Sequence, residues 1–192
     1  MSYLILGLFI FLGAHSVRIV ADDWRTRTRA RIGALPWKVL YSVVSLLGFV
    51  LIVWGFGLVR QQPVQLWSPP VALRHLASLL TLLSFVLWVA AYVPGNIIKE
   101  RIHHPMVVGV KVWALAHLLA NGNLGHVILF GSFLVWAIVD FISARRRDRA
   151  LGTRYAGGTA GATGITVALG VAAWIGFALW LHGLLIGVRP LG

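Results

Sequence analysis

Long apolar runs, repeated along the whole chain, constrain this sequence more than any other feature. A run of about 18 or more apolar residues is long enough for a helix to cross the hydrocarbon core of a bilayer. Only 11% of the 192 residues are charged, and a soluble domain needs roughly a quarter of its residues charged to cover its surface. The mean hydropathy of +0.85 is likewise far above that of a soluble domain. We therefore predict an integral membrane protein.

The apolar runs predict an all-α bundle of six transmembrane helices that forms one domain over residues 1–192. Turn-forming residues separate the runs, among them Pro69-Pro70 and Asn121-Gly122-Asn123. The first run lacks a basic leader and a cleavage site of small residues, which favours an uncleaved helix over a signal peptide. The predicted spans are residues 3–20, 39–59, 71–93, 106–120, 124–142 and 164–188.

The basic residues indicate how the spans are oriented. Thirteen of the seventeen lie in three connections, at 18–38, 99–101 and 145–154, which share one side of the membrane if six spans alternate. The positive-inside rule then places these connections in the cytoplasm and both termini outside. The net charge of +12 does not predict nucleic-acid binding, because no compact basic domain exists to dock a duplex. We expect membrane lipid to be the partner of these loops.

The absence of cysteine limits the metal chemistry available to the chain. It excludes thiolate-ligated haem, iron–sulfur clusters and disulfides. Five carboxylates and seven histidines remain, so histidine is the expected metal ligand. The sequence also has no nucleotide-binding motif, no Ser/His/Asp set and no paired carboxylates, which argues against hydrolysis and phosphoryl transfer.

Two histidines within predicted spans are the expected ligands of a cofactor. An ionisable side chain in a bilayer is costly and therefore marks a functional site by default. His15 and His117 lie among apolar neighbours on separate spans, as the two axial ligands of haem b in a helical bundle do. Arg18 follows His15 by three residues on the same helical face, where it is placed to pair with a haem propionate. At about 1.5 Å per residue His15 lies about 7 Å from the basic side and His117 about 18–20 Å, so sharing one iron requires tilted helices or a fourth span that starts below the membrane surface.

Lys111 is a third ionisable group inside a predicted span. Asp140, on the antiparallel fifth span, is predicted at a similar depth, so a Lys111–Asp140 ion pair would remove two isolated charges at once. The alternative is that Lys111 contacts a haem propionate or an anionic substrate. The remaining histidines carry no assigned role: His126 lies in the fifth span, and we expect four others to lie near water, namely His75, His103, His104 and His182.

Three segments carry a resemblance to a known family. Residues 104–122 contain the run H-P-x-x-x-G-x-K-x-W-A-x-A-H, from His104 to His117. Residues 130–136 followed by Asp140 continue the match, as does Ala14-His15-Ser16 with Arg18. Over essentially its whole length the chain resembles the NnrU family of bacterial membrane proteins.

The resemblance implies a cellular role, a cofactor and its ligands. NnrU-like proteins are associated with denitrification, near nitrite and nitric oxide reductase functions. The family also includes the plant 15-cis-zeta-carotene isomerase, a membrane protein whose haem b is held by two histidines. By motif position those ligands correspond to His15 and His117. Arg18 and Lys111 stay expected cofactor contacts because of their positions in the spans, not because of the resemblance. The implied location is the bacterial inner membrane.

Three functions follow as hypotheses. The first is a haem b protein of nitrogen-oxide metabolism, with nitric oxide as a ligand and respiratory or denitrification membrane proteins as partners. The second is a haem-dependent cis–trans isomerase of a carotenoid-like polyene, so whether the chain is an enzyme stays open. The third is a haem-free transporter or assembly factor, in which Lys111 and Asp140 line a polar path.

Overall fold

The computed structural model describes residues 1–191, and these fold almost entirely into helices without a β-strand. Six helices are mainly apolar, and two short polar helices lie between them. A π-helical turn and a final short helix follow the last apolar helix. In chain order the elements are α1 (Ser2–Val20), α2 (Asp22–Ile32), α3 (Ala34–Gln61), α4 (Val71–Tyr92), α5 (Ile97–Ile102), α6 (Pro105–Ala120), α7 (Leu124–Leu151), α8 (Ala160–Gly176), the π-turn η1 (Phe177–Leu181) and α9 (His182–Ile186).

The predicted multi-span membrane bundle is confirmed. Five helices are long and apolar enough to cross a bilayer, the last running from α8 to the end of α9. α6 is the sixth apolar helix, with only 16 residues. It begins at Pro105, one residue before the predicted span, with proline at the first helical position.

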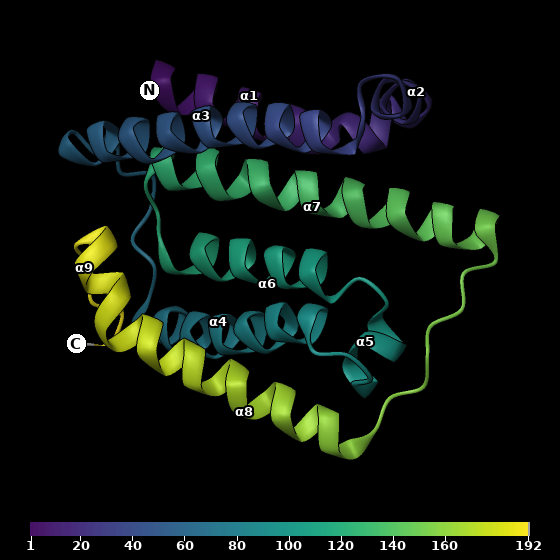
Figure 1. Ribbon diagram of the computed structural model, residues 1–192. Helices are drawn as coiled ribbons and strands as arrows, with labels where there is room; N and C mark the ends of the chain where they lie inside the picture. Colours follow the sequence, from purple (N-terminus) through teal and green to yellow (C-terminus); the bar gives the residue numbers. More distant parts are fainter. Residues whose placement is uncertain (192) are drawn as a thin grey trace.

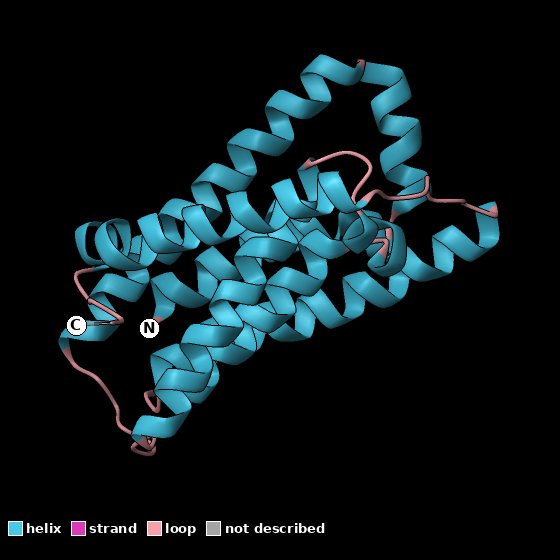
Figure 2. Cartoon of the chain, turned by 90° about the horizontal axis from the view of Figure 1, so that it is seen from below, coloured by secondary structure: helices cyan, strands magenta, loops and turns pink. Residues whose placement is uncertain are grey.

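The six apolar helices run alternately up and down, so the connections gather at two opposite ends (Figures 1 and 2). Both termini and the 62–70 connection lie at one end, which we call the terminal end. The other end carries α2, α5 and the 152–159 connection, and we call it the basic end. The arrangement fits an even number of spans and brings the three basic connections to one side, as the charge pattern predicts.

Across the bundle the helices lie in the order α3, α1, α7, α6, α4 and α8, which differs from their order in the chain. α1 and α3 form a close pair, α1 also packs on α7, α7 packs on α6, α6 on α4, and α4 on α8 (Figure 1). Leu4, Leu8, Ala114, Leu129 and Phe130 belong to the buried core, which joins α1 and α3 to α6 and α7. α6 thus lies between two other spans, where both of its broad faces contact protein.

Glycine allows the close approach of α1 and α3. A Cβ atom on Gly48 would lie 2.7 Å from the backbone nitrogen of Phe11, and one on Gly7 would lie 2.6 Å from that of Ile52. The two helices therefore pack backbone against backbone at these points. This is the expected mode of association in lipid, where close van der Waals packing between small residues replaces the hydrophobic effect.

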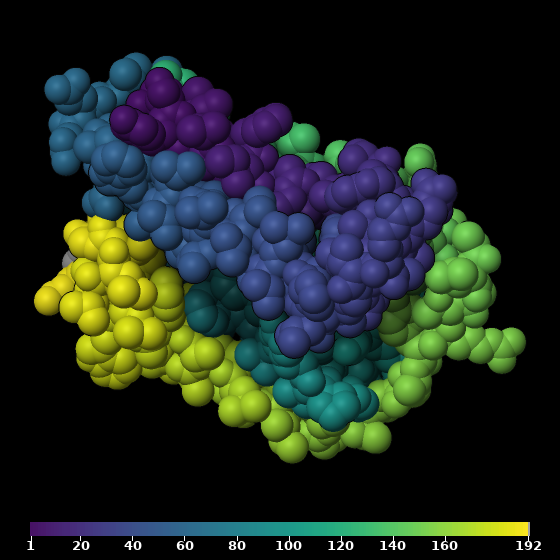
Figure 3. Space-filling model, turned by 45° about the horizontal axis from the view of Figure 1, so that its top comes forward, coloured from purple at the N-terminus to yellow at the C-terminus, as the bar shows by residue number. Residues whose placement is uncertain are grey.

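Two helices were not anticipated from the sequence, because both occur in segments expected to be connections. α2 is highly polar, but Asp22 and Asp23 occupy its first turn and Arg29 and Arg31 its last turn, which complements the helix dipole. It joins α1 to α3 at the basic end, lies across the direction of α3 (Figures 1 and 2) and covers part of one face of the molecule (Figure 3). α5 is a single short helix capped by the Asn96 side chain, which accepts a hydrogen bond from the backbone N–H of Lys99.

Candidate functional site

His15 lies near the basic end of α1 in a setting of aromatic rings. Its Nδ1–H donates to the carbonyl oxygen of Phe11, one turn earlier, at 2.7 Å. The imidazole stacks on the Phe11 ring with centroids 4.2 Å apart. Tyr41 from α3 and Trp136 from α7 meet it edge-on at 5.2 and 6.0 Å. Nε2 therefore stays without a hydrogen-bond partner among the described residues.

His117 repeats this local arrangement near the terminal end of α6. Its Nδ1–H donates to the carbonyl oxygen of Trp113 at 2.8 Å. The ring stacks on Phe130 of α7 at 4.4 Å, and the Trp113 ring lies at 5.1 Å. His126, also from α7, lies 6.0 Å from the same Phe130 ring. His117 and His126 therefore lie on either side of the α6–α7 contact, close to the terminal end.

The structure does not bring His15 and His117 together. His15 lies beside Trp136 and His117 beside Phe130, and these two α7 residues are six positions apart, or about 9 Å along the helix. Phe133 fills the space between, packing on Phe11 at 5.8 Å and on Trp113 at 5.5 Å. A ligand nitrogen lies about 2 Å from its metal. In this arrangement the two histidines do not reach one iron together.

Two arginines lie at the basic end of the His15 site. Arg18 occupies the last turn of α1, where its Nε lies 3.9 Å from Asp22. Its backbone oxygen accepts a hydrogen bond from Nη1 of Arg147 at 3.4 Å, and the same Nη1 donates to Ser143 at 2.7 Å. The guanidinium of Arg147 thus joins α7 to the end of α1, one turn from His15. Arg18 and Arg147 thus place two cations where α1 and α7 meet at the basic end.

Lys111 does not pair with Asp140, so that prediction was wrong. Its Nζ lies 3.7 Å from the centroid of the Phe141 ring, a cation–π contact between α6 and α7. None of the ion pairs in residues 1–191 involves either Lys111 or Asp140. The predicted depth of Lys111 relative to α7 was right to within one residue, but the predicted partner lies on another face of α7, because neighbouring residues on a helix point about 100° apart. Phe141 is the residue that faces α6.

A polar network at the basic end was missed, because its histidines were expected simply to lie near water. Nε2–H of His104 donates to Asp148 at 2.7 Å, and the Tyr155 hydroxyl donates to the same carboxylate oxygen at 3.0 Å. The His103 ring stacks on Tyr155 at 4.2 Å and has a backbone φ of +68°, the one positive value outside glycine in the described chain. Burial and the hydrogen bond to Asp148 raise the pKa of Tyr155 above its ordinary value. No sequence signal links His104 to a partner 44 residues away.

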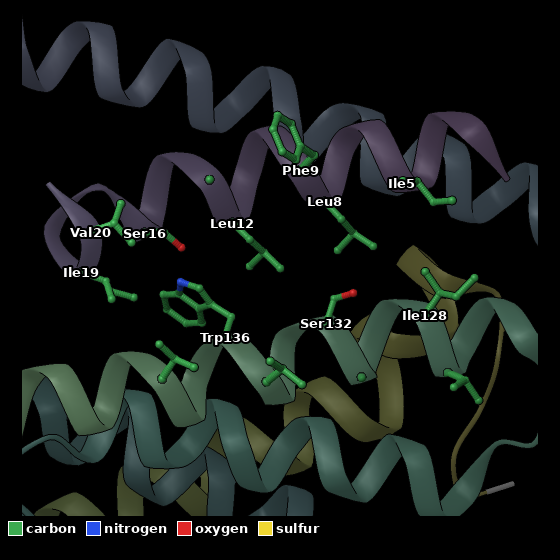
Figure 4. A pocket seen from close by; sticks show the side chains of 15 residues that line it. Ile5, Leu8, Phe9, Leu12, Ser16, Ile19, Val20, Ile128, Ser132 and Trp136 are labelled. Atoms are coloured by element: carbon green, nitrogen blue, oxygen red, sulfur yellow. The ribbon is translucent and has the colours of Figure 1, made fainter.

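An apolar groove runs between α1 and α7 (Figure 4). It has a volume of about 720 Å³ and extends from Ile5 and Ile128 near the terminal end to Val20 near the basic end. Trp136 lies in its wall and also contacts His15, so it is shared by the groove and the histidine site. Within residues 1–191 no group of three or more acidic or histidine side chains could hold a metal ion.

Comparison with known proteins identifies one family. Residues 3–190 match the family model described as NnrU protein. The curated proteins and the solved structures give no match.

Proposed function

Because the chain belongs to the NnrU family, we propose that it is a membrane protein of nitrogen-oxide metabolism that binds haem b through His15. The proposal depends on the hydrogen bonding of the His15 ring. Its Nδ1–H donates to the carbonyl oxygen of Phe11 at 2.7 Å, and its Nε2 has no hydrogen-bond partner within residues 1–191. Metal-ligating histidines are oriented in this way by a hydrogen bond from their other ring nitrogen. We also propose that the basic end faces the cytoplasm of a bacterial inner membrane.

The neighbouring residues would each serve such a site. Phe11, Tyr41 and Trp136 contact the imidazole and would hold it in one orientation. Arg18 and Arg147 would pair with the two propionates from the basic end. Haem bound through His15 would supply an iron able to take a diatomic ligand such as nitric oxide. Lys111 lies between α6 and α7 and is not part of this site.

Absorption spectra of the detergent-purified protein, oxidised and reduced with dithionite, test the proposal. We expect a b-type spectrum in the wild type, its loss in His15→Ala and its retention in His117→Ala, which is the matched control with the same local geometry. A spectrum that needs both histidines would overturn single-histidine binding. A colourless wild type from cells supplied with haem precursor would contradict haem binding altogether, and would favour the transport or assembly role.

The groove between α1 and α7 supports a second function, isomerisation of a polyene. A linear apolar molecule fits a long groove of this kind, and Trp136 would lie between it and His15. Turnover of a cis-carotene by the purified protein, measured by chromatography of the products, tests this directly. Loss of turnover in His15→Ala would support it, and an inactive wild type with an intact haem spectrum would exclude it for that substrate.

A further inference from the structure

The polar helix α2 lies where two membrane spans leave the bilayer. One residue separates it from α1 and one residue separates it from α3. It also lies across the direction of α3 (Figures 1 and 2). Both ends of α2 are therefore held at the level where the spans emerge, so the helix lies along the membrane surface. In contrast, α7 continues straight outward and ends farther from the bundle than α2 (Figure 1).

The bundle alone gives α2 little stabilisation. None of its 11 residues is buried, whereas helices in proteins are stabilised mainly by the packing of an apolar face. Like charges four positions apart on a helix also destabilise it. Four positions separate Arg25 from Arg29, and the same spacing recurs between Arg27 and Arg31. A helix of this composition is stabilised by an anionic partner that lies outside the bundle.

Three arginines of α2 are available to such a partner. Asp22 pairs with Arg25 at 3.7 Å and with Arg18 of α1 at 3.9 Å, so these two cations are partly neutralised. The other arginines of the helix are exposed and take part in none of the ion pairs within residues 1–191, namely Arg27, Arg29 and Arg31. Their guanidinium groups point to phosphate or carboxylate as the chemistry of the partner.

An exposed tryptophan favours a lipid over a soluble anion. Trp24 lies three positions before Arg27 and seven before Arg31, so the three side chains share one face of α2. Trp24 is 53% exposed, and its ring meets that of Trp37 from α3 edge-on at 5.9 Å. Tryptophan is enriched at membrane–water interfaces, where its apolar ring meets acyl chains and its N–H meets headgroups. An anion bound beside Trp24 is therefore expected to carry an acyl chain.

We propose that α2 is a binding site for anionic phospholipid, whose phosphate groups pair with Arg27, Arg29 and Arg31. Clusters of basic residues next to a span attract anionic lipid in this way. Neutralising the arginines removes their mutual repulsion, so the bound lipid would order α2 and fix the ends of α1 and α3 that it joins. The proposal rests on the charge and position of α2 and does not require that haem be bound.

A fluorescent label on α2 of the full-length protein in lipid nanodiscs tests the proposal. The chain contains no cysteine, so Ala30→Cys, at an exposed position, gives a single site for the label. Quenching by phosphatidylglycerol and by phosphatidylcholine, each carrying a nitroxide near its headgroup, measures how strongly each lipid associates with α2. We expect phosphatidylglycerol to associate at least fivefold more strongly, and Arg27→Gln/Arg29→Gln/Arg31→Gln to abolish that preference.

The matched control removes the same charge from exposed arginines farther out at the basic end. It carries Arg146→Gln, Arg149→Gln and Arg154→Gln, and it should keep the preference of the wild type. Equal quenching by the two lipids in the wild type would overturn the proposal. An equal loss in both triple variants would overturn it too, because it would show attraction to net charge rather than a site on α2. Displacement of phosphatidylglycerol by equimolar inorganic phosphate would mean that the site takes a free anion.

Hydrogen exchange of the α2 amides tests the ordering of the helix. Phosphatidylglycerol nanodiscs should slow this exchange at least fivefold in the wild type, relative to phosphatidylcholine, and leave it unchanged in the α2 triple variant. Exchange that is independent of the lipid would overturn the claim that lipid stabilises α2. Neither measurement depends on the haem spectrum, so this proposal and the haem proposal can fail separately.

Discussion

Replacing Gly48 by alanine should loosen the α1–α3 pair and disturb His15 at the same time. The new Cβ atom would lie 2.7 Å from the Phe11 nitrogen and 2.9 Å from its Cα, whereas ordinary van der Waals contact begins at 3.4 Å. Because these are backbone atoms, α1 must move away by about 0.7 Å or more to relieve the contact. Overpacking of this kind costs about 1–3 kcal/mol.

Gly57→Ala is the reference for this substitution. It lies on the same helix, and a Cβ atom there meets nothing within 4 Å. Both variants gain about 1 kcal/mol in helix propensity, so the difference between their free energies of unfolding isolates the overpacking cost of about 1–3 kcal/mol. Reversible unfolding in mixed detergent micelles measures that difference, and equal stability of the two variants would refute the reasoning.

The Gly48 substitution also has a functional readout. Phe11 both stacks on His15 and accepts the hydrogen bond from its Nδ1–H. Displacing the Phe11 backbone should therefore reorient the imidazole. If His15 ligates haem, Gly48→Ala should change the haem spectrum while Gly57→Ala leaves it intact.

Three further outcomes are expected near the basic end. A double-mutant cycle between Lys111 and Asp140 should give a coupling energy near zero, whereas Lys111 and Phe141 should couple by about 0.5–2 kcal/mol through their cation–π contact. Tyr155→Phe should lower the free energy of unfolding by about 1 kcal/mol at pH 7, because it removes the hydrogen bond to Asp148. The raised folded-state pKa of Tyr155 favours the protonated hydroxyl, so this stabilisation is complete below the ordinary pKa of 10.0 and is lost as the pH rises through the raised value. Between pH 8 and pH 11 the free energy of unfolding should therefore fall more for the wild type than for Tyr155→Phe.

Much of the fold could be predicted because membrane spans are specified by the length of local apolar runs. The start of α6 at Pro105 and the close of α4 near Tyr92 follow from adjacent residues alone. α2 was missed for the opposite reason: its helix is stabilised by charges at its ends rather than by an apolar face.

The candidate site was harder to predict, because it depends on which helix faces meet. Residue spacing along the spans predicts the depth of Lys111. Packing decides whether Asp140 or Phe141 of α7 faces α6, and the sequence does not show how the two helices pack. The His104–Asp148 contact joins residues 44 positions apart. His15 and His117 were paired because both lie among apolar neighbours on separate spans, and the family resemblance pointed to the same pair. The difference in depth that the sequence predicts for them is present in the structure.

The shortness of α6 affects how the protein would respond to a membrane potential. Its 16 residues span about 24 Å, less than the hydrocarbon core of about 30 Å, and polar segments adjoin both of its ends. The potential therefore falls over a shorter distance along α6, and the electric field there is steeper than in the surrounding lipid. Lys111 lies six residues from Pro105, a little over a third of the way across. At about 2.3 kcal/mol per charge for each 100 mV, its charge would feel about 0.9 kcal/mol, so a change in the membrane potential acts directly on the contact between α6 and α7 that Lys111 makes.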